Sequence, residues 1–189
     1  MLKGRTNHRT AWVCALAFAL CPALAGEARA QEWVYKPSTS TGPTIDAYVK
    51  QVGPEANIIA HGDLQIDGKS VNCGKRPTVI NPNFDSWGGA FPGFLILNTN
   101  KISGLTTQVK LYIYSHECGH ILHGPSETAA DCYAVRRARR EGWLTREALE
   151  DICAAFNIAG HGPVHPDAKA RCSQLRQCFA SRAGAAPSP

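Results

Sequence analysis

The chain has 189 residues, and its 20 basic and 15 acidic side chains give a formal net charge of +5 at pH 7. Four of the basic residues and one acidic residue lie within positions 1–30, so the remaining 159 residues carry a net charge of +2. That charge is too small for a protein that binds nucleic acid or an anionic membrane surface, and 159 residues suit one domain with a hydrophobic core.

Residues 1–30 have the organisation of a secretory signal peptide. A basic start precedes an almost wholly apolar run over residues 11–25, and Ala28 and Ala30 supply small side chains where a signal peptidase cleaves. The apolar run is short for a membrane span, and Pro22 interrupts it. We therefore expect cleavage after Ala30, an exported chain that is periplasmic or secreted, and no stable membrane insertion after cleavage.

The first half of the mature chain favours short strands separated by turns. A short helix is expected at 45–52, and residues 93–98 form the most apolar strand candidate, which ends at Asn98. Residues 81–90 are rich in Gly, Asn, Asp and Pro, which indicates a turn region. Strands are expected at 56–66, 77–80 and 93–98.

The second half favours helices, which we expect over 106–123, 127–141, from Thr145 onwards and over 167–179. The first of them stops at Gly124-Pro125, a common helix ending, and Ser126 is placed to cap the second. Residues 181–189 have nothing to bury and are expected to be disordered. Strands followed by helices predict an α+β domain over residues 31–180.

The helix expected at 106–123 contains the segment His116-Glu117-Cys118-Gly119-His120. Residues four apart lie on one face of a helix, so both imidazoles can reach one metal ion, and Glu117 lies beside that face. Zinc takes nitrogen, sulfur or carboxylate ligands and keeps one position open in catalytic sites. The pattern predicts zinc bound by His116 and His120, with Glu117 as the general base that takes a proton from a metal-activated water.

A third ligand is expected from the helix at 127–141, which begins with carboxylates. Glu127 and Asp131 are four residues apart and share a face, which an antiparallel arrangement of the two helices would turn towards the histidines. We favour Glu127 as the ligand and Asp131 as the group that orients a ligand histidine through its free N–H. The reverse assignment, with Asp131 as the ligand, stays open, and His123 is a further candidate.

These residues resemble the gluzincin zinc metallopeptidases, in particular the HtpX-type and related neutral zinc peptidases, in which H-E-x-x-H is followed by E-x-x-A-D. The matching E-x-x-A-D segment begins at Glu127, and the resemblance implies Glu127 as the third zinc ligand within a small zincin-like fold. His165 and Arg171 lie in a segment similar to the family's H-P-x-x-x-x-R, which implies a catalytic place for His165 near the substrate, with Arg171 beside it. The resemblance covers residues 109–178. The sequence departs from many members of the family because no transmembrane helix is visible.

Six cysteines remain after signal cleavage, and an even number in an exported protein predicts disulfides in one of 15 pairings. Within one helix, Cys172 and Cys178 would have Cα atoms roughly 9 Å apart, which is too far for a disulfide. Each is therefore expected to tie the last helix to an earlier residue such as Cys73 or Cys153. Cys118 points away from the zinc face and is expected to tie its helix to the body, with Cys132 as one reachable partner.

The sequence therefore predicts a disulfide-stapled zinc metallopeptidase that acts on a peptide or protein substrate, with the extended substrate paired to the strand at 93–98. One alternative is a non-catalytic periplasmic binding protein that keeps zinc for stability. Another is a zinc hydrolase of non-protein amides such as cell-wall peptides. Glu117 favours catalysis, because a structural site needs no general base. The sequence does not determine cleavage specificity or oligomeric state.

Overall fold

The computed structural model describes residues 42–159 and 167–181. The expected signal peptide, His165 and the tail beyond Ser181 lie outside the described residues. The helices are α1 Ile45–Val52, α2 Thr99–Ile102, α3 Thr107–His123, α4 Glu127–Arg140, α5 Arg146–Ala159 and α6 Ala168–Ala180. The strands are β1 Asn57–Ile59, β2 Gln65–Ile66, β3 Lys69–Ser70, β4 Thr78–Ile80, β5 Gly88–Phe91 and β6 Phe94–Leu97. Within these two ranges, no helix has the length and apolar character that a membrane crossing requires.

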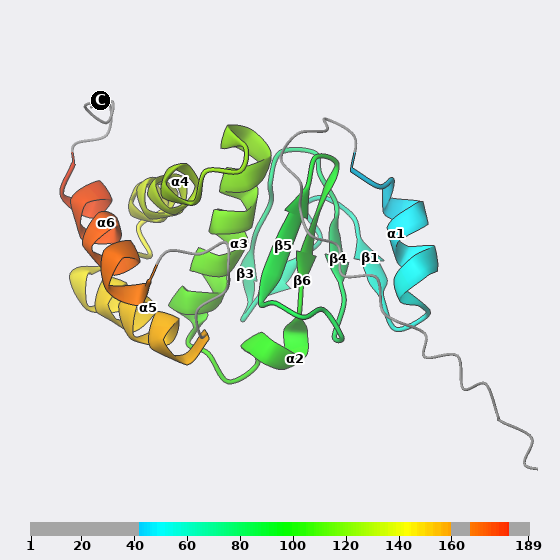
Figure 1. Cartoon of the computed structure of the whole chain (residues 1–189), viewed down its shortest axis with the longest axis horizontal. Helices are drawn as coiled ribbons and strands as arrows, with labels where there is room; N and C mark the ends of the chain where they lie inside the picture. The colour runs from blue at the N-terminus through cyan, green and yellow to red at the C-terminus, as the bar shows by residue number, and fades with distance from the viewer. Residues whose placement is uncertain (1–41, 160–166, 182–189) are drawn as a thin grey trace, which may run out of the picture. The chain divides into compact units, whose positions relative to one another are not determined.

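The larger sheet lies between helices on both of its faces. Its strand order is β1-β4-β6-β5, with β4 and β6 parallel and the two outer pairs antiparallel, while β2 and β3 form a separate hairpin. Figure 1 shows α1 on one side of this sheet and α3 on the other, with α4, α5 and α6 beyond α3. The domain is therefore α+β, with strands and helices segregated along the sequence as expected.

Alternate residues of β6 face two separate cores, as the two-residue repeat of a strand requires. Phe94 and Ile96 pack with Tyr48 of α1, whereas Leu95 and Leu97 pack in the larger core that includes α3. All four side chains are buried. β6 is thus a central strand, and its apolar run reflects burial on both faces.

The helices expected from the sequence are present within one or two residues of their predicted bounds. Thr106, Ser126 and Thr145 each accept a hydrogen bond from the backbone N–H three residues later, which anchors the starts of α3, α4 and α5. Gly124 ends α3 with a φ of 77°, a conformation that favours glycine. The capping and ending signals in the sequence were sufficient to place these elements.

The expectations for the strands needed correction. The stretch 56–66 is not one strand, because it contributes β1 to the larger sheet and β2 to the hairpin. The stretch 81–90, expected to be turns, contains most of β5. Gly89 is packed so closely that an added Cβ would lie 2.8 Å from the ring of Phe84. The glycines of this stretch therefore allow close packing within a strand as well as turning.

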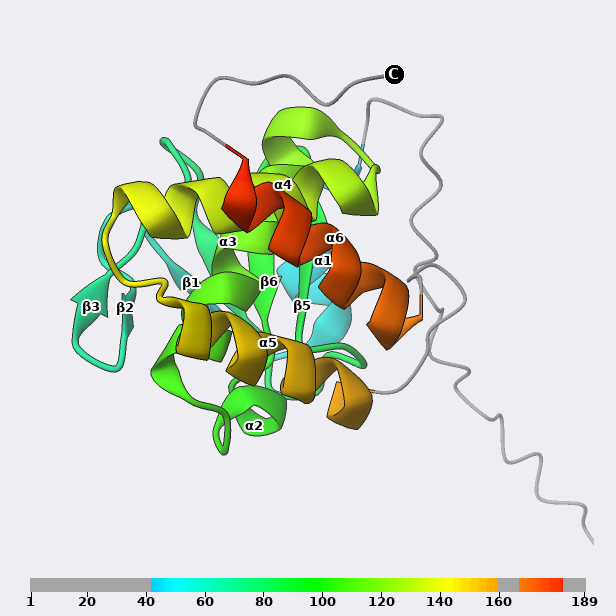
Figure 2. The same ribbon diagram turned by 90° about the vertical axis from the view of Figure 1, so that its left-hand side faces the viewer.

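Three cysteine pairs lie at disulfide distance. Cys73 pairs with Cys118, Cys132 with Cys178, and Cys153 with Cys172, with Cα–Cα distances of 5.6, 5.2 and 5.3 Å. The prediction that Cys172 and Cys178 do not bond to each other is confirmed. Cys118 does tie α3 to the body, but its partner is Cys73, because Cys132 bonds to α6. Figure 2 shows α6 lying between α4 and α5, the two helices to which its cysteines are bonded.

Candidate metal centre

Helix α3 brings two imidazoles together near its C-terminal end. His116 and His120 are one turn apart, and their Nε2 atoms lie 2.9 Å from each other. The side chain of His116 is 6 % exposed and that of His120 is 15 % exposed. The pair therefore lies at the boundary of the core, with its His120 side closer to solvent.

Glu127, in the first turn of α4, completes a group of three potential ligands. Its carboxylate oxygens lie 3.3 Å from Nε2 of His116 and 3.3 Å from Nε2 of His120. Atoms bound to zinc at about 2.0–2.2 Å in a tetrahedron lie roughly 3.3–3.6 Å apart. The distances between the three residues are therefore close to those that a single zinc ion requires. Two nitrogen donors and one carboxylate also match the composition of catalytic zinc sites.

Gly119 explains how Glu127 can approach the histidines so closely. A Cβ added at Gly119 would lie 2.7 Å from Cα of Ala130 and 3.0 Å from its carbonyl oxygen. The backbones of α3 and α4 are thus in contact at a point between the two histidines and opposite the first turns of α4. A larger residue at position 119 would push α4, and Glu127 with it, away from α3.

The second nitrogen of each imidazole is also engaged. Nδ1 of His116 lies 2.7 Å from Oδ1 of Asp131, and Nδ1 of His120 lies 3.0 Å from the carbonyl oxygen of Gly124. Both acceptors favour a proton on Nδ1, which leaves the Nε2 lone pairs directed at the shared centre. Asp131 therefore contacts the Nδ1 side of the His116 ring, and Glu127 contacts the Nε2 side.

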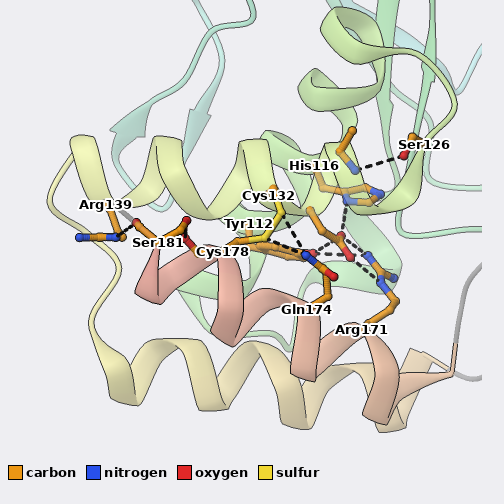
Figure 3. Close-up of a disulfide and its surroundings, with 11 residues drawn as sticks. Tyr112, His116, Ser126, Cys132, Arg139, Arg171, Gln174, Cys178 and Ser181 are labelled. Carbon is orange, nitrogen blue, oxygen red and sulfur yellow. Dashed lines mark hydrogen bonds and ion pairs between the residues drawn. A yellow bond between two sulfur atoms is a disulfide. The ribbon is translucent and has the colours of Figure 1, made fainter. Parts of the chain in front are cut away.

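Asp131 is itself surrounded by donors from α3 and α6. The hydroxyl of Tyr112 lies 2.5 Å from Oδ1, and Arg171 contacts Oδ1 at 2.6 Å through Nη2 and Oδ2 at 3.1 Å through Nε. Figure 3 shows the side chains of Tyr112 and Arg171 converging from the two helices beside His116. Asp131 is almost fully buried, and these partners compensate for the loss of water around its charge.

Electrostatics link His116 to the carboxylates. Burial on its own would lower the pKa of His116, but contacts with Asp131 and Glu127 and the charges of Asp131 and Glu117 outweigh it and raise the pKa to about 9. Burial would raise the pKa of Asp131, but His116 and Arg171 outweigh it and hold the pKa at about 2. The cluster therefore has an excess of negative charge that attracts a cation, either a proton or a metal ion.

Glu117 lies on the sheet side of the centre. A Cβ added at Gly88 in β5 would lie 2.9 Å from Cγ and 3.2 Å from Oε1 of Glu117, and 3.2 Å from Ile113. The absence of a side chain at Gly88 thus leaves room for Glu117 between α3 and the edge of the sheet. The side chain of Glu117 is partly exposed.

The structure brings together His116, His120 and Glu127, with Asp131 behind His116. It does not bring His123 to the centre. That residue is exposed at the end of α3, and its ring packs 5.4 Å from the ring of Tyr133. His165 lies outside the described residues. The side chain of Arg171 is 11 % exposed, and its Nη2 lies 2.6 Å from Oδ1 of Asp131 and 4.0 Å from Oε2 of Glu127. Its place near a substrate stays a prediction.

Three residues with a part in this arrangement were not assigned one from the sequence: Tyr112, Gly88 and Gly119. Tyr112 precedes His116 by one helical turn, so the four-residue spacing that links the histidines could have placed its hydroxyl near them. Nothing in the local sequence distinguishes Gly88 or Gly119 from other glycines, because the atoms that exclude a side chain belong to other elements.

Comparison of the sequence and fold with models of known protein families, with curated proteins and with solved structures finds no match.

Proposed function

We propose that this protein is an exported zinc-dependent peptidase of the gluzincin type, with zinc held by His116, His120 and Glu127. The observation that carries the proposal is the convergence of His116, His120 and Glu127: the two Nε2 atoms lie 2.9 Å apart, and each lies 3.3 Å from one of the two carboxylate oxygens of Glu127, with both Nδ1 atoms engaged elsewhere. The three cysteine pairs suit an oxidising compartment, which supports export.

The roles of the side chains follow from their positions. A bound zinc ion supplies Lewis acidity towards water and towards a carbonyl oxygen. Glu117, beside the ligand face and next to the sheet edge, accepts the proton of the attacking water and later donates it to the leaving amine. Asp131 holds the ring of His116 in place and fixes its tautomer.

The edge of the sheet supports a peptide as substrate. The sequence predicts that a substrate pairs with the strand at 93–98, but β6 cannot receive a peptide strand, because β4 and β5 occupy both of its edges. The N–H of Asn98 donates to the carbonyl of Trp87, and the register places Gly89 and Phe91 in the other hydrogen-bonded pairs with β6. The N–H and C=O groups of Gly88 and Ala90 consequently point away from the sheet. An extended peptide paired with them would pass beside Glu117.

The decisive experiment compares Glu117→Gln with wild type in zinc content and in cleavage of a broad peptide library. We expect Glu117→Gln to bind zinc and fold normally, and to lose activity by about 10²–10⁴-fold, the usual contribution of a general base. Glu150→Gln is the matched control, since Glu150 is an exposed glutamate that pairs with Arg176 on the helical side. Full zinc content without cleavage in wild type would favour a zinc-stabilised binding protein, or a hydrolase of other amides.

A further inference from the structure

Helix α6 contributes Arg171 to the surroundings of the metal centre, although no residue of α6 belongs to the three potential ligands. Arg171 contacts both oxygens of Asp131, its Nη2 lies 3.3 Å from the hydroxyl of Tyr112, and its guanidinium lies 4.3 Å from the ring centroid of Phe156. A planar guanidinium held on both oxygens and on an aromatic face has one defined orientation. Arg171 therefore helps, together with Tyr112, to fix the orientation of the Asp131 carboxylate behind His116. Its Nη2 also lies 4.0 Å from Oε2 of Glu127.

Little fully buried apolar surface holds α6 in this position. Its buried residues are Cys172, Leu175 and Cys178, so two of the three are disulfide-bonded cysteines. Phe179 packs against the core while only partly buried, and the pair between Arg176 and Glu150 is exposed. The position of α6 thus depends strongly on its disulfides to α4 and α5.

The disulfides are attached next to the ion pair itself. Cys132 directly follows Asp131, and Cys172 directly follows Arg171. The Cys132–Cys178 disulfide joins α4, which carries Asp131, to α6, which carries Arg171. Gln174 lies beside this disulfide, with Nε2 at 3.5 Å from Sγ of Cys132 and 3.3 Å from Sγ of Cys178 (Figure 3).

We propose that Arg171 is a positioning residue of the metal centre, that it acts on His116 through Asp131, and that the Cys132–Cys178 disulfide keeps it there. The inference rests on the proposed zinc site and adds a dependence of that site on the oxidation state of α6. A dithiol reductant would transfer two electrons and two protons to the Cys132–Cys178 bond, leaving two thiols and the oxidised reductant. With that bond open, no disulfide would join α6 to α4, although Cys153–Cys172 would still join α6 to α5. Arg171 would then be held against α4 only by its own contacts, and His116 would be less firmly oriented.

The first part of the test is a zinc competition titration of wild type, Arg171→Gln, Arg171→Lys and Arg176→Gln. We expect Arg171→Gln to weaken zinc binding about tenfold or more, as losses behind a ligand histidine do. Arg171→Lys should fall between Arg171→Gln and wild type, because it restores the charge without the fork. Arg176→Gln removes an arginine–carboxylate pair from the same helix and should leave the affinity unchanged.

The second part repeats Arg171→Gln in the Cys132→Ser/Cys178→Ser background, with circular dichroism to verify folding. The disulfide-free background should bind zinc less tightly, and Arg171→Gln should cost less there than in wild type, since the two changes share one pathway. Equal zinc affinity for wild type and Arg171→Gln overturns the inference while leaving the zinc site intact. Fully additive losses overturn the role of the disulfide. A wild type that binds no zinc overturns the metal centre together with this inference.

Discussion

At the scale of single residues, the close approach of the α3 and α4 backbones depends on the absence of a side chain at Gly119. Alanine is favoured over glycine in a helix by about 1 kcal/mol, so Gly119 is kept against local propensity. The contact with the backbone of Ala130 accounts for it, since backbone atoms cannot move aside as the end of a flexible side chain can.

We expect Gly119→Ala to destabilise the protein and weaken zinc binding. Overpacking typically costs about 1–3 kcal/mol, which exceeds the gain in helix propensity of about 1 kcal/mol. Urea unfolding and a zinc titration measure the two effects. Gly104→Ala is the control, because an added Cβ there meets nothing within 4 Å. Unchanged stability in Gly119→Ala would mean that the two helices can separate without cost.

The raised pKa of His116 predicts a pH dependence for zinc binding. In the metal-free protein the imidazole is protonated below about pH 9, and a metal ion has to displace that proton. Apparent zinc affinity should therefore rise about tenfold per pH unit towards pH 9 and then become level. Competition titrations between about pH 6.5 and 9.5 measure this slope. A flat profile over that range would show that His116 is neutral in the metal-free site.

The same shift affects the stability of the metal-free protein. Because the folded-state pKa of His116 is raised, its contribution is fully present below the unfolded value of 6.5 and is lost as the pH rises through about 9. Asp131 has a lowered pKa of about 2, so its contribution is present above 3.8 and is lost as the pH falls through about 2.

At the scale of elements, the proposed binding of a peptide depends on the outer edge of β5. Among the described residues, β5 is paired with β6 alone. Proline is tolerated in edge strands where its missing N–H faces outward, and the N–H of Ala90 is in that position.

Ala90→Pro should therefore leave the fold and the zinc affinity unchanged and reduce peptide cleavage, mainly through a higher KM. The change removes one backbone donor to the substrate, for which a net loss of about 0.5–1.5 kcal/mol, or roughly 2- to 12-fold, is expected. Steady-state kinetics on one library-derived peptide measure it, and Ala90→Ser, which keeps the N–H, is the control. Equal KM values for the two variants would exclude strand pairing at Ala90.

The longer helices were predictable from the sequence, whereas the four-residue helix α2 was not, and the strands were predictable only in part. Capping residues such as Thr106 and Ser126 act locally, so a short window of sequence contains the information that places α3 and α4. The Gly-rich sequence of 81–90 predicts a turn, whereas Gly88 and Gly89 belong to β5 and are packed against Glu117 and Phe84. A local window of sequence does not contain this information, because the contacts join separate elements of the fold. The partners of Cys118 and Cys178 depend on the same long-range packing.

At the scale of the whole molecule, the four-residue spacings on α3 and α4 predicted that the two histidines would face carboxylates of α4, and left open whether Glu127 or Asp131 lies at the shared centre. They did not predict the contacts that Tyr112 and Arg171 make with Asp131 behind His116. The resemblance predicts Arg171 near a substrate, and this stays a prediction. The docking of α6 on α4 adds a contact between Arg171 and Asp131 that the motif does not predict. The partners that a residue meets within a site depend on how the helices pack, and a sequence motif does not contain that information.

Zinc should stabilise the whole domain, because the three potential ligands come from two helices. At a hundredfold excess of free zinc over its Kd, the expected gain is about 2.7 kcal/mol, or roughly 5–10 °C in Tm for a domain of this size. Thermal unfolding with zinc and with a chelator measures the shift, and His120→Ala should show almost none. The same shift in both proteins would place the stabilising ion elsewhere.

The sequence of β5 bears on the choice of substrates. Gly88, Gly89 and Ala90 offer the neighbouring strand a backbone with almost no side chains. An enzyme that binds its substrate along such a strand would make few contacts with the substrate's side chains. It would require instead that the substrate be locally extended. The rate of cleavage would then depend mainly on whether a segment of the substrate is unfolded. Unfolding a stable substrate protein should increase its cleavage rate far more than changing its amino-acid sequence.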